Sequence, residues 1–251
     1  MVHELCRIDD RIWELFEGWE ETLIYSCLQQ TMGKVYVTDR EAPRSAMAFV
    51  GCFAFYAGVP DRELVLNKPD GFVIMTPQNE AWSKLIAECW PQGEKTVRYA
   101  TRKDTVFDEE KLRRMAKELP DGYDMRKIDG EIYDRCLLSP ATEDFVSSFG
   151  SREKYLRYGR GVVILKDGEI VAGASSYTSY RQGIEIEVDT VPSERRKNLA
   201  TAACAALILD CLKDGLYPSW DAQNRISLHL AEKLGYEFSH EYEVYTVRRT
   251  E

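Results

Sequence analysis

The residues best placed to do chemistry lie where an apolar strand gives way to an alanine-rich helix. The stretch from Val188 to Pro192 reads as the end of a strand, and a short basic loop leads from it into a helix beginning near Arg196. Backbone N–H groups at the start of a helix lack partners within the helix, and the helix dipole adds partial positive charge there. Such a helix start is suited to binding a pyrophosphate group.

Side chains of this segment strengthen its attraction for anions. The basic residues supply formal positive charge, and the small residues after them leave room for a ligand to approach the backbone. The candidate ligand-binding residues here are Val188, Thr190, Arg195, Arg196, Lys197, Asn198, Leu199, Ala200 and Thr201. The alternative is that the basic run is only the solvated first turn of a helix.

A second candidate segment covers residues 217–236. Asn224 precedes a helical pattern that ends at Gly235, a residue type that commonly terminates helices. We add Asn224 and Ser227 to the candidate ligand-binding residues. The alternatives are that Asn224 only caps its helix and that Ser227 is a packing residue.

Together the two segments resemble the signature motifs of the GNAT superfamily of N-acetyltransferases. The first motif is a strand, a proline and then Arg/Gln-x-x-Gly-x-Gly/Ala, which here reads Arg-Arg-Lys-Asn-Leu-Ala over residues 195–200. The second, Asn-x-x-Ala/Ser-x-x-Leu-x-x-Lys-x-Gly-Phe/Tyr, matches residues 224–236. Asn198 replaces the central glycine, and Asn is the residue besides Gly that best tolerates a left-handed backbone.

The resemblance covers about residues 121–251 and implies an acyl-CoA-dependent N-acyltransferase in which Asn224 contacts the pantetheine arm of coenzyme A. The second segment is also similar to the subgroup that includes the zwittermicin A self-resistance acetyltransferase, through Trp220, Asp221, Asn224, Ser227 and Ala231. In that subgroup the N-terminal half is thought to repeat the same fold without a working cofactor site.

Transfer of an acyl group to an amine requires a base that accepts the amine proton. On the strand expected at Gly183–Val191, the carboxylates Glu185, Glu187 and Asp189 alternate with apolar residues and share one face. Carboxylates in a covered sheet are costly unless they line a wet cleft. We therefore predict Glu185 or Glu187 as the general base, acting through water. The alternative is an exposed sheet face.

The group that stabilises the departing thiolate is harder to place. The resemblance implies a tyrosine in the helix after Asn224, but Ala231 stands at that position. His229 is a candidate, and the alternative is a surface histidine. The backbone N–H groups of Val188 and Thr190 are candidates for polarising the acyl carbonyl. Tyrosines on nearby strands are further candidates, at positions 177, 180, 242 and 245.

The elements that must position these residues read, from residue 121 onward, as strand, helices, three antiparallel strands, helix, strand, helix and strand. The clearest element is a hairpin with strands at 161–166 and 169–177, joined by Asp167-Gly168, a dipeptide typical of a type I′ turn. This order predicts a mixed α/β fold with a mostly antiparallel central sheet flanked by helices, as in the GNAT family.

The first half reads as a separate α/β domain. A helical pattern covers Asp10–Gln30, and no segment here has the spacing of a catalytic or phosphate-binding motif. Strand-like runs follow at Lys34–Thr38, Ala46–Ala57 and Phe72–Thr76. Because Pro120-Asp121-Gly122 is a turn signal, we predict a degenerate domain without a cofactor site at 1–120 and an acyl-CoA-binding catalytic domain at 121–251.

The charge of the chain narrows the choice of partners. Its 251 residues include 33 Lys and Arg against 42 Asp and Glu, a formal net charge of −9. Nonspecific binding to nucleic acid or to an anionic membrane would meet repulsion, whereas an amine-bearing substrate suits this field.

Other bulk features predict a cytoplasmic protein without a metal site. No run approaches the roughly 20 apolar residues of a membrane-spanning helix, and Met1–Asp10 is too polar for a secretory signal. The seven cysteines include no C-x-x-C pair. We predict buried reduced thiols rather than metal ligands at Cys52, Cys89, Cys204 and Cys211. The sequence is compatible with a homodimer but does not specify the oligomeric state.

These observations lead to a ranked set of hypotheses. The first is transfer of an acetyl group from acetyl-CoA to a primary amine of a small molecule. The second is a catalytically silent protein that binds acyl-CoA and regulates another process, because the glycine of the first motif and the usual tyrosine are both replaced. The third is transfer to a protein N-terminus or lysine.

Overall fold

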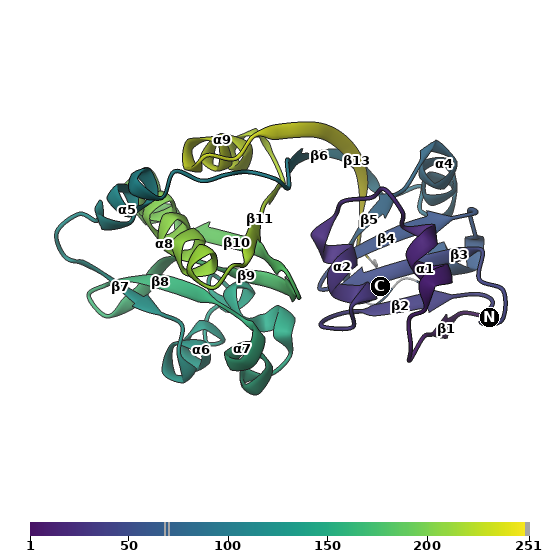
Figure 1. The fold of residues 1–251 in the computed structure, drawn as a ribbon, viewed down its shortest axis with the longest axis horizontal. Helices are drawn as coiled ribbons and strands as arrows, with labels where there is room; N and C mark the ends of the chain where they lie inside the picture. Colours follow the sequence, from purple (N-terminus) through teal and green to yellow (C-terminus); the bar gives the residue numbers. More distant parts are fainter. Residues whose placement is uncertain (68, 70, 249–251) are drawn as a thin grey trace. The chain divides into compact units, whose positions relative to one another are not determined.

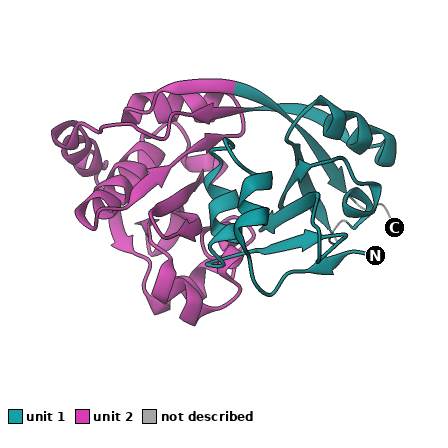
Figure 2. Ribbon diagram, turned by 45° about the vertical axis from the view of Figure 1, so that its right-hand side comes forward, with its two compact units in different colours: residues 1–98, 241–251 teal, residues 99–240 magenta. Residues whose placement is uncertain are grey.

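A computed structural model of the chain describes residues 1–67, 69 and 71–248 (Figure 1). The chain forms two compact units, one made of residues 1–98 with the segment from Glu241 onward and the other of Tyr99–His240 (Figure 2). Two strands, β6 (Glu94–Thr101) and β13 (Phe238–Arg248), run from one unit into the other. No helix in the described part of the chain is long and apolar enough to span a membrane.

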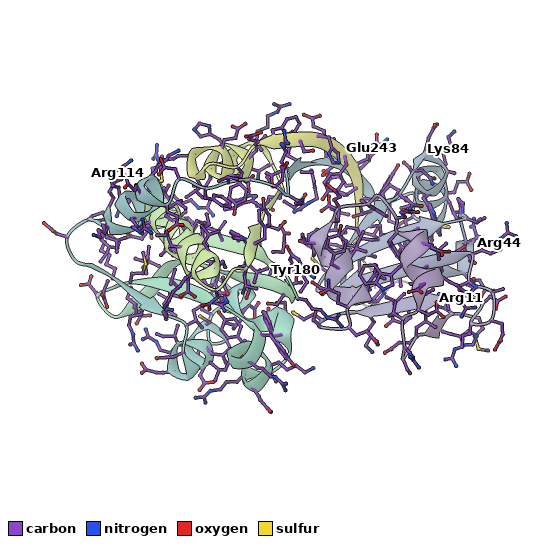
Figure 3. All side chains as sticks on the ribbon, in the orientation of Figure 1. Arg11, Arg44, Lys84, Arg114, Tyr180 and Glu243 are labelled. Atoms are coloured by element: carbon purple, nitrogen blue, oxygen red, sulfur yellow. The ribbon has the colours of Figure 1, made fainter. Side chains whose placement is uncertain are left out.

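The two units divide between Arg98 and Tyr99 and again between His240 and Glu241, whereas the sequence suggested a boundary at residue 120. Helix α5 (Glu109–Lys117) lies in the second unit, where Leu112 is fully buried and the helix packs against α8 (Leu199–Lys213). Arg114 on the same helix is exposed (Figure 3). Residues 241–248 of β13 lie in the first unit, where the strand pairs with β5 (Phe72–Pro77). Both placements depend on partners distant in sequence, which a local turn signal does not report.

The second unit is built on a five-stranded sheet in the order β11-β10-β9-β8-β7. Its strands are β7 (Tyr123–Lys127), β8 (Gly161–Lys166), β9 (Glu169–Tyr180), β10 (Gly183–Thr190) and β11 (Tyr217–Ser219). All neighbours are antiparallel except β10 and β11, which are parallel. Asp167 and Gly168 both have positive φ angles, 51° and 84°, which confirms the predicted β8–β9 hairpin turn.

Helices cover both faces of this sheet (Figure 1). Helix α8 is apolar around most of its circumference because it packs against β8, β9 and β10 on one side and α5 on the other. The opposite face carries α6 (Gly130–Cys136) and α7 (Arg152–Tyr158). Between α6 and α7 the chain forms two short 3₁₀ turns, Glu143–Phe145 and Ser147–Phe149, and Gly150 at φ 70° separates the second turn from α7.

The first unit has a sheet in the order β1-β2-β3-β4-β5 with β13 beside β5. The further strands are β1 (His3–Glu4), β2 (Lys34–Val37), β3 (Ser45–Val50) and β4 (Phe53–Gly58), and the helices are α1 (Asp10–Leu15), α2 (Thr22–Leu28), α3 (Arg62–Leu66) and α4 (Glu80–Cys89). The prediction of one helix over Asp10–Gln30 is wrong, because Gly18 at φ 73° separates α1 from α2. The run Ala46–Ala57 is likewise the β3–β4 hairpin, which turns at Gly51.

The two units repeat one topology. The order β1-α1-α2-β2-β3-β4-α3-β5-α4 corresponds to β7-α6-α7-β8-β9-β10-α8-β11-α9, where α9 is Arg225–Leu234. Strands pair in the same order and sense in both sheets, including one parallel pair each, β4–β5 and β10–β11. This confirms the predicted mixed α/β fold with an N-terminal copy. The copy is reduced at one helix, since α3 has 5 residues and α8 has 15.

Candidate functional site

An open cavity of about 910 Å³ lies beside the start of α8 in the second unit. Pairing between β10 and β11 ends at Glu185 and Ser219, while β10 continues to Thr190. The strands therefore part, and the end of β10, the loop after Pro192, the first turn of α8 and one side of α9 line the opening.

The cavity brings together all but one of the residues predicted to bind a ligand. Those that line it are Val188, Thr190, Arg195, Arg196, Asn198, Leu199, Ala200, Thr201, Asn224 and Ser227. His229, a predicted catalytic residue, also lines it. Three further lining residues, Pro192, Leu230 and Lys233, are motif positions that were not named as ligand-binding candidates, and the remaining ones are Asp189, Glu194, Gln223 and Ile226.

The backbone at the start of α8 has the conformation that an anion site requires. Asn198 has φ 65° and ψ 10°, which is the left-handed conformation predicted for the position where the family has glycine. Within the described chain, the backbone N–H groups of Leu199, Ala200 and Thr201 have no hydrogen-bond acceptor, as expected for a first helical turn. Three donors at the positive end of a 15-residue helix are therefore available to a ligand.

Thr190, the last residue of β10, also lines the cavity, although its side chain is only 8% exposed. Its Oγ1 is buried and has no hydrogen-bond partner among the described residues.

The backbone donors of β10 are occupied by neighbouring carboxylates. The N–H of Val188 donates to Glu187 Oε1 at 3.1 Å, and the N–H of Thr190 donates to Asp189 Oδ1 at 2.7 Å. A ligand carbonyl that binds either donor must displace the carboxylate. These are the two N–H groups that the sequence predicted to polarise the acyl carbonyl.

Lys197 is the predicted ligand-binding residue that the cavity does not include. Its ammonium group donates to Glu194 Oε2 at 2.8 Å and to the Tyr123 hydroxyl at 3.1 Å. Glu194 also accepts from Tyr123 and, at 3.1 Å, from Lys166. The hydrogen bonds from Lys197, Tyr123 and Lys166 lower the pKa of Glu194 to about 2. Lys197 therefore ties the loop to β7 and β8.

The two arginines of the loop remain beside the cavity. Arg195 donates from Nε to the backbone oxygen of Thr190 at 3.0 Å, and its guanidinium lies 3.6 Å from Asp189. Arg196 is exposed and adopts φ 65°. Both can therefore place positive charge at the mouth of the cavity without breaking a buried ion pair.

The second motif forms the facing wall. Asn224 Oδ1 accepts from the backbone N–H groups of Ile226 and Ser227 at 3.0 and 2.9 Å, so Asn224 does cap α9 while lining the cavity. Ser227 Oγ accepts from the indole N–H of Trp220 at 3.1 Å. Gly235 ends the helix with φ 115°, as predicted.

Lys233 joins the two motifs. Its ammonium group donates to Asn198 Oδ1 at 2.6 Å and to Thr201 Oγ1 at 3.2 Å. The sequence offered a signal for this residue, since lysine stands in the second motif, but its partners lie about 35 positions earlier in the chain.

The predicted bases lie on β10 but outside the cavity lining. Ile184, Ile186 and Val188 pack against the core on the α8 side, so Glu185 and Glu187 face the other way, as the alternation predicted. Glu185 is 3% exposed, which contradicts the alternative of an exposed sheet face for that residue.

The surroundings of Glu185 are polar. It stands beside Thr178 of β9 and Ser219 of β11 in the sheet register, and both are buried. The ammonium group of Lys103 donates to Ser219 Oγ at 3.0 Å.

The cysteines vary in burial. Cys204 and Cys211 are buried in α8, as predicted, and burial raises the pKa of Cys211 to about 12. Cys52 and Cys89 are only half-buried. In the described part of the chain, no group of three or more His, Cys, Asp or Glu side chains is placed to hold a metal ion.

The corresponding helix start in the first unit is closed. Asp61 caps α3 by accepting from the backbone N–H groups of Glu63 and Leu64 at 2.8 and 3.4 Å. Thr38 Oγ1 donates to the same carboxylate at 2.6 Å. A negative charge thus occupies the donors that α8 leaves open.

Comparison with known proteins identifies the family. A family model described as GNAT acetyltransferase matches residues 13–245, so the chain belongs to the GNAT acetyltransferase family. It is similar to a crystal structure of a GCN5-related N-acetyltransferase-like protein from Streptococcus suis 89/1591, with 46% identity, a TM-score of 0.90, and coverage of 94% of this chain and 96% of that one.

Two further proteins to which this chain is similar are also described as N-acetyltransferase or GNAT proteins. An uncharacterized N-acetyltransferase, YdfB, from Bacillus subtilis (strain 168) is 25% identical over 248 residues, covering 89% of both chains. A tandem GNAT protein from the clavulanic acid biosynthesis pathway shares the fold, with 12% identity, a TM-score of 0.51 and 98% coverage of both chains. Its tandem architecture matches the repeat seen here.

Glu194 and the three groups that donate to it, Tyr123, Lys166 and Lys197, are called the Glu194 cluster, and this cluster leads to a pH-dependent prediction. Because the pKa of Glu194 is lowered from 4.5 to about 2 on folding, its ionised form stabilises the fold above pH 4.5, and this contribution is lost as the pH falls from about 4.5 towards 2. Glu194→Gln should therefore be less stable than the wild type at pH 7, with the difference shrinking at acid pH. Urea denaturation at pH 7, 4 and 3 measures it. Glu110→Gln, at an exposed carboxylate of α5, is the matched control, and a pH-independent difference for Glu194→Gln would contradict the assignment.

Proposed function

We propose that the protein transfers an acetyl group from acetyl-CoA to a primary amine of a small molecule. The observation that carries this proposal is the open start of α8, where three N–H groups without acceptors in the described chain line a cavity with positive side chains at its mouth. Membership of the GNAT acetyltransferase family supports the choice of acetyl-CoA as donor.

The cavity residues fit coenzyme A by the chemistry of their donors. The N–H groups of Leu199, Ala200 and Thr201, with Arg196, would hold the diphosphate. The small side chain of Ala200 allows close approach. The end of β10 and Asn224 would hold the pantetheine arm. Bound acetyl-CoA supplies an acyl group activated as a thioester.

The chain's own residues supply the proton chemistry in this proposal. Glu185 or Glu187 accepts the amine proton through water, so that the neutral amine can attack. The carboxylate row on β10 and the formal net charge of −9 favour an amine that arrives as a cation. His229, which is exposed at the cavity, is the candidate for protonating the thiolate.

The acceptor is proposed to be a small molecule because of the second motif. Its resemblance to the subgroup of the zwittermicin A self-resistance acetyltransferase supports an amino-sugar or peptide-like antibiotic. The first unit is proposed not to bind coenzyme A, since Asp61 places a carboxylate on the N–H groups of α3.

A second candidate is a catalytically silent acyl-CoA-binding protein. The observation that favours it is the occupation of the Val188 and Thr190 donors by Glu187 and Asp189, together with Ala231 at the position of the usual tyrosine. A protein of this kind would bind the cofactor without releasing its thiol.

Calorimetric titration with coenzyme A and a thiol-release assay over a panel of primary amines separate the two candidates. We expect saturable binding at one site per chain and thiol release with at least one amine. Binding without release for every amine would favour the silent protein. No binding of coenzyme A or acetyl-CoA would overturn both.

The arginines and Lys197 are expected to differ in their effect on the donor. Arg196→Ala should raise the KM for acetyl-CoA roughly three- to tenfold and leave the acceptor KM unchanged, because an exposed charge contributes about 1 kcal/mol to an ion pair. Lys197→Met should change this KM less than about twofold, since its ammonium group is bound by Glu194. Steady-state kinetics measure both. An equal rise in the two variants would show that Lys197 reaches the phosphates.

The base is tested by isosteric substitutions on β10. Glu185→Gln or Glu187→Gln should lower kcat by about 10²- to 10⁴-fold, because a general base contributes that much. Asp189→Asn, in the same row, is the matched control and should cost much less. Unchanged kcat in both glutamine variants would remove the proposed base from this strand.

A further inference from the structure

We propose that Lys233 is a positioning residue that fixes the diphosphate loop through Asn198, the residue that stands where the first motif has glycine. This inference rests on the proposed binding of coenzyme A at the α8 cavity. It assigns a role to a residue on α9 that acts on a loop in a different part of the fold.

The loop has a conformational requirement that its sequence meets only in part. Asn198 must hold φ 65° and ψ 10° for α8 to begin at Leu199 with its N–H groups directed outward. Glycine adopts this conformation without steric cost, whereas asparagine tolerates it less well. A loop with asparagine there has other conformations available, so additional contacts must favour the observed one.

The side chain of Asn198 provides those contacts. Its Oδ1 accepts from Lys233 Nζ at 2.6 Å, and its Nδ2 donates to Glu118 Oε2 at 3.4 Å. Only one orientation of the amide satisfies both partners, because a flip would place its NH₂ against an ammonium group and its oxygen against a carboxylate. The opposite charges of Lys233 and Glu118 therefore fix the side chain, and with it the backbone to which it is attached.

Lys233 also holds the helix side of the loop. The same ammonium group donates to Thr201 Oγ1 at 3.2 Å, so it bridges the residue before α8 and a residue of the first turn. Lys233 is exposed, Asn198 is half-buried and Thr201 is buried. Two of its three N–H donors are thus bound at the start of α8, and in this proposal its effect on a phosphate is indirect.

A double-mutant cycle distinguishes this role from direct phosphate binding. Lys233→Met should weaken coenzyme A binding about three- to tenfold in the wild-type background, as expected for loss of a charged hydrogen bond at an exposed site. In an Asn198→Gly background, where the loop no longer depends on the clamp, the same substitution should cost less than about twofold. Titration calorimetry measures all four proteins. An equal loss in both backgrounds would overturn the proposal, because it would mean that Lys233 contacts the ligand directly.

Further variants sharpen the result. Asn198→Ala should bind coenzyme A more weakly than Asn198→Gly, because alanine has neither the conformational freedom nor the amide. Lys213→Met, at an exposed lysine in the last turn of α8, is the matched charge control and should bind as the wild type does. In kinetics, Lys233→Met should raise the KM for acetyl-CoA and leave kcat and the acceptor KM unchanged; a fall in kcat alone would contradict a positioning role.

A ligand-free measurement keeps this inference separable from the proposed function. Hydrogen exchange of the Ala202 amide, which donates to the backbone oxygen of Asn198 at 3.1 Å, should become faster in Lys233→Met than in the wild type, and should be the same in Asn198→Gly with and without that substitution. If the wild type binds no coenzyme A, the proposed function fails while this exchange pattern still tests the clamp. Unchanged exchange in Lys233→Met would overturn the clamp even if coenzyme A binds.

Discussion

The site depends on the unpaired backbone donors at the start of α8. Those N–H groups stay open only if the helix is held from outside its first turn, because no side chain caps it. Packing of α8 between the sheet and α5 holds the helix body, and the Glu194 cluster holds the preceding loop to β7 and β8. The apolar packing of α8 and the hydrogen bonds of Glu194 thus both keep the first N–H groups of α8 open.

The repeated fold contains two helix starts of the same kind that differ in their hydrogen bonds. Both units place a short loop and a helix between two parallel strands, which is the geometry that presents a helix start. In the first unit Asp61 caps α3 with its own carboxylate, and the helix is only 5 residues long. A capping carboxylate stabilises a helix locally and repels an anion, so Asp61 gives the start of α3 a different electrostatic character from the uncapped start of α8.

Sequence reasoning succeeded where the relevant interaction is local. The Asp167-Gly168 turn, the left-handed Asn198 and the face of β10 that carries Glu185 depend on neighbours in the chain, and the structure confirms each. Contacts between distant residues had no such local signal. Lys197 is bound by Glu194 and Tyr123, and α5 packs in the second unit because Leu112 is buried against α8. No spacing rule reports those pairings.

Charge gives the last constraint, because the proposed ligand is itself an anion. A chain with a net charge of −9 repels coenzyme A at long range, so attraction must be generated within the cavity. Lys197 shares the carboxylate of Glu194 with Lys166 and is not part of the cavity lining. The N–H groups of α8 carry no formal charge that a carboxylate could neutralise at a distance, and Arg196 lies beside them. Binding should therefore depend more on the shape of the loop than on the number of its basic residues. For the same reason, a residue that holds Asn198 in place should affect binding although it does not contact the ligand.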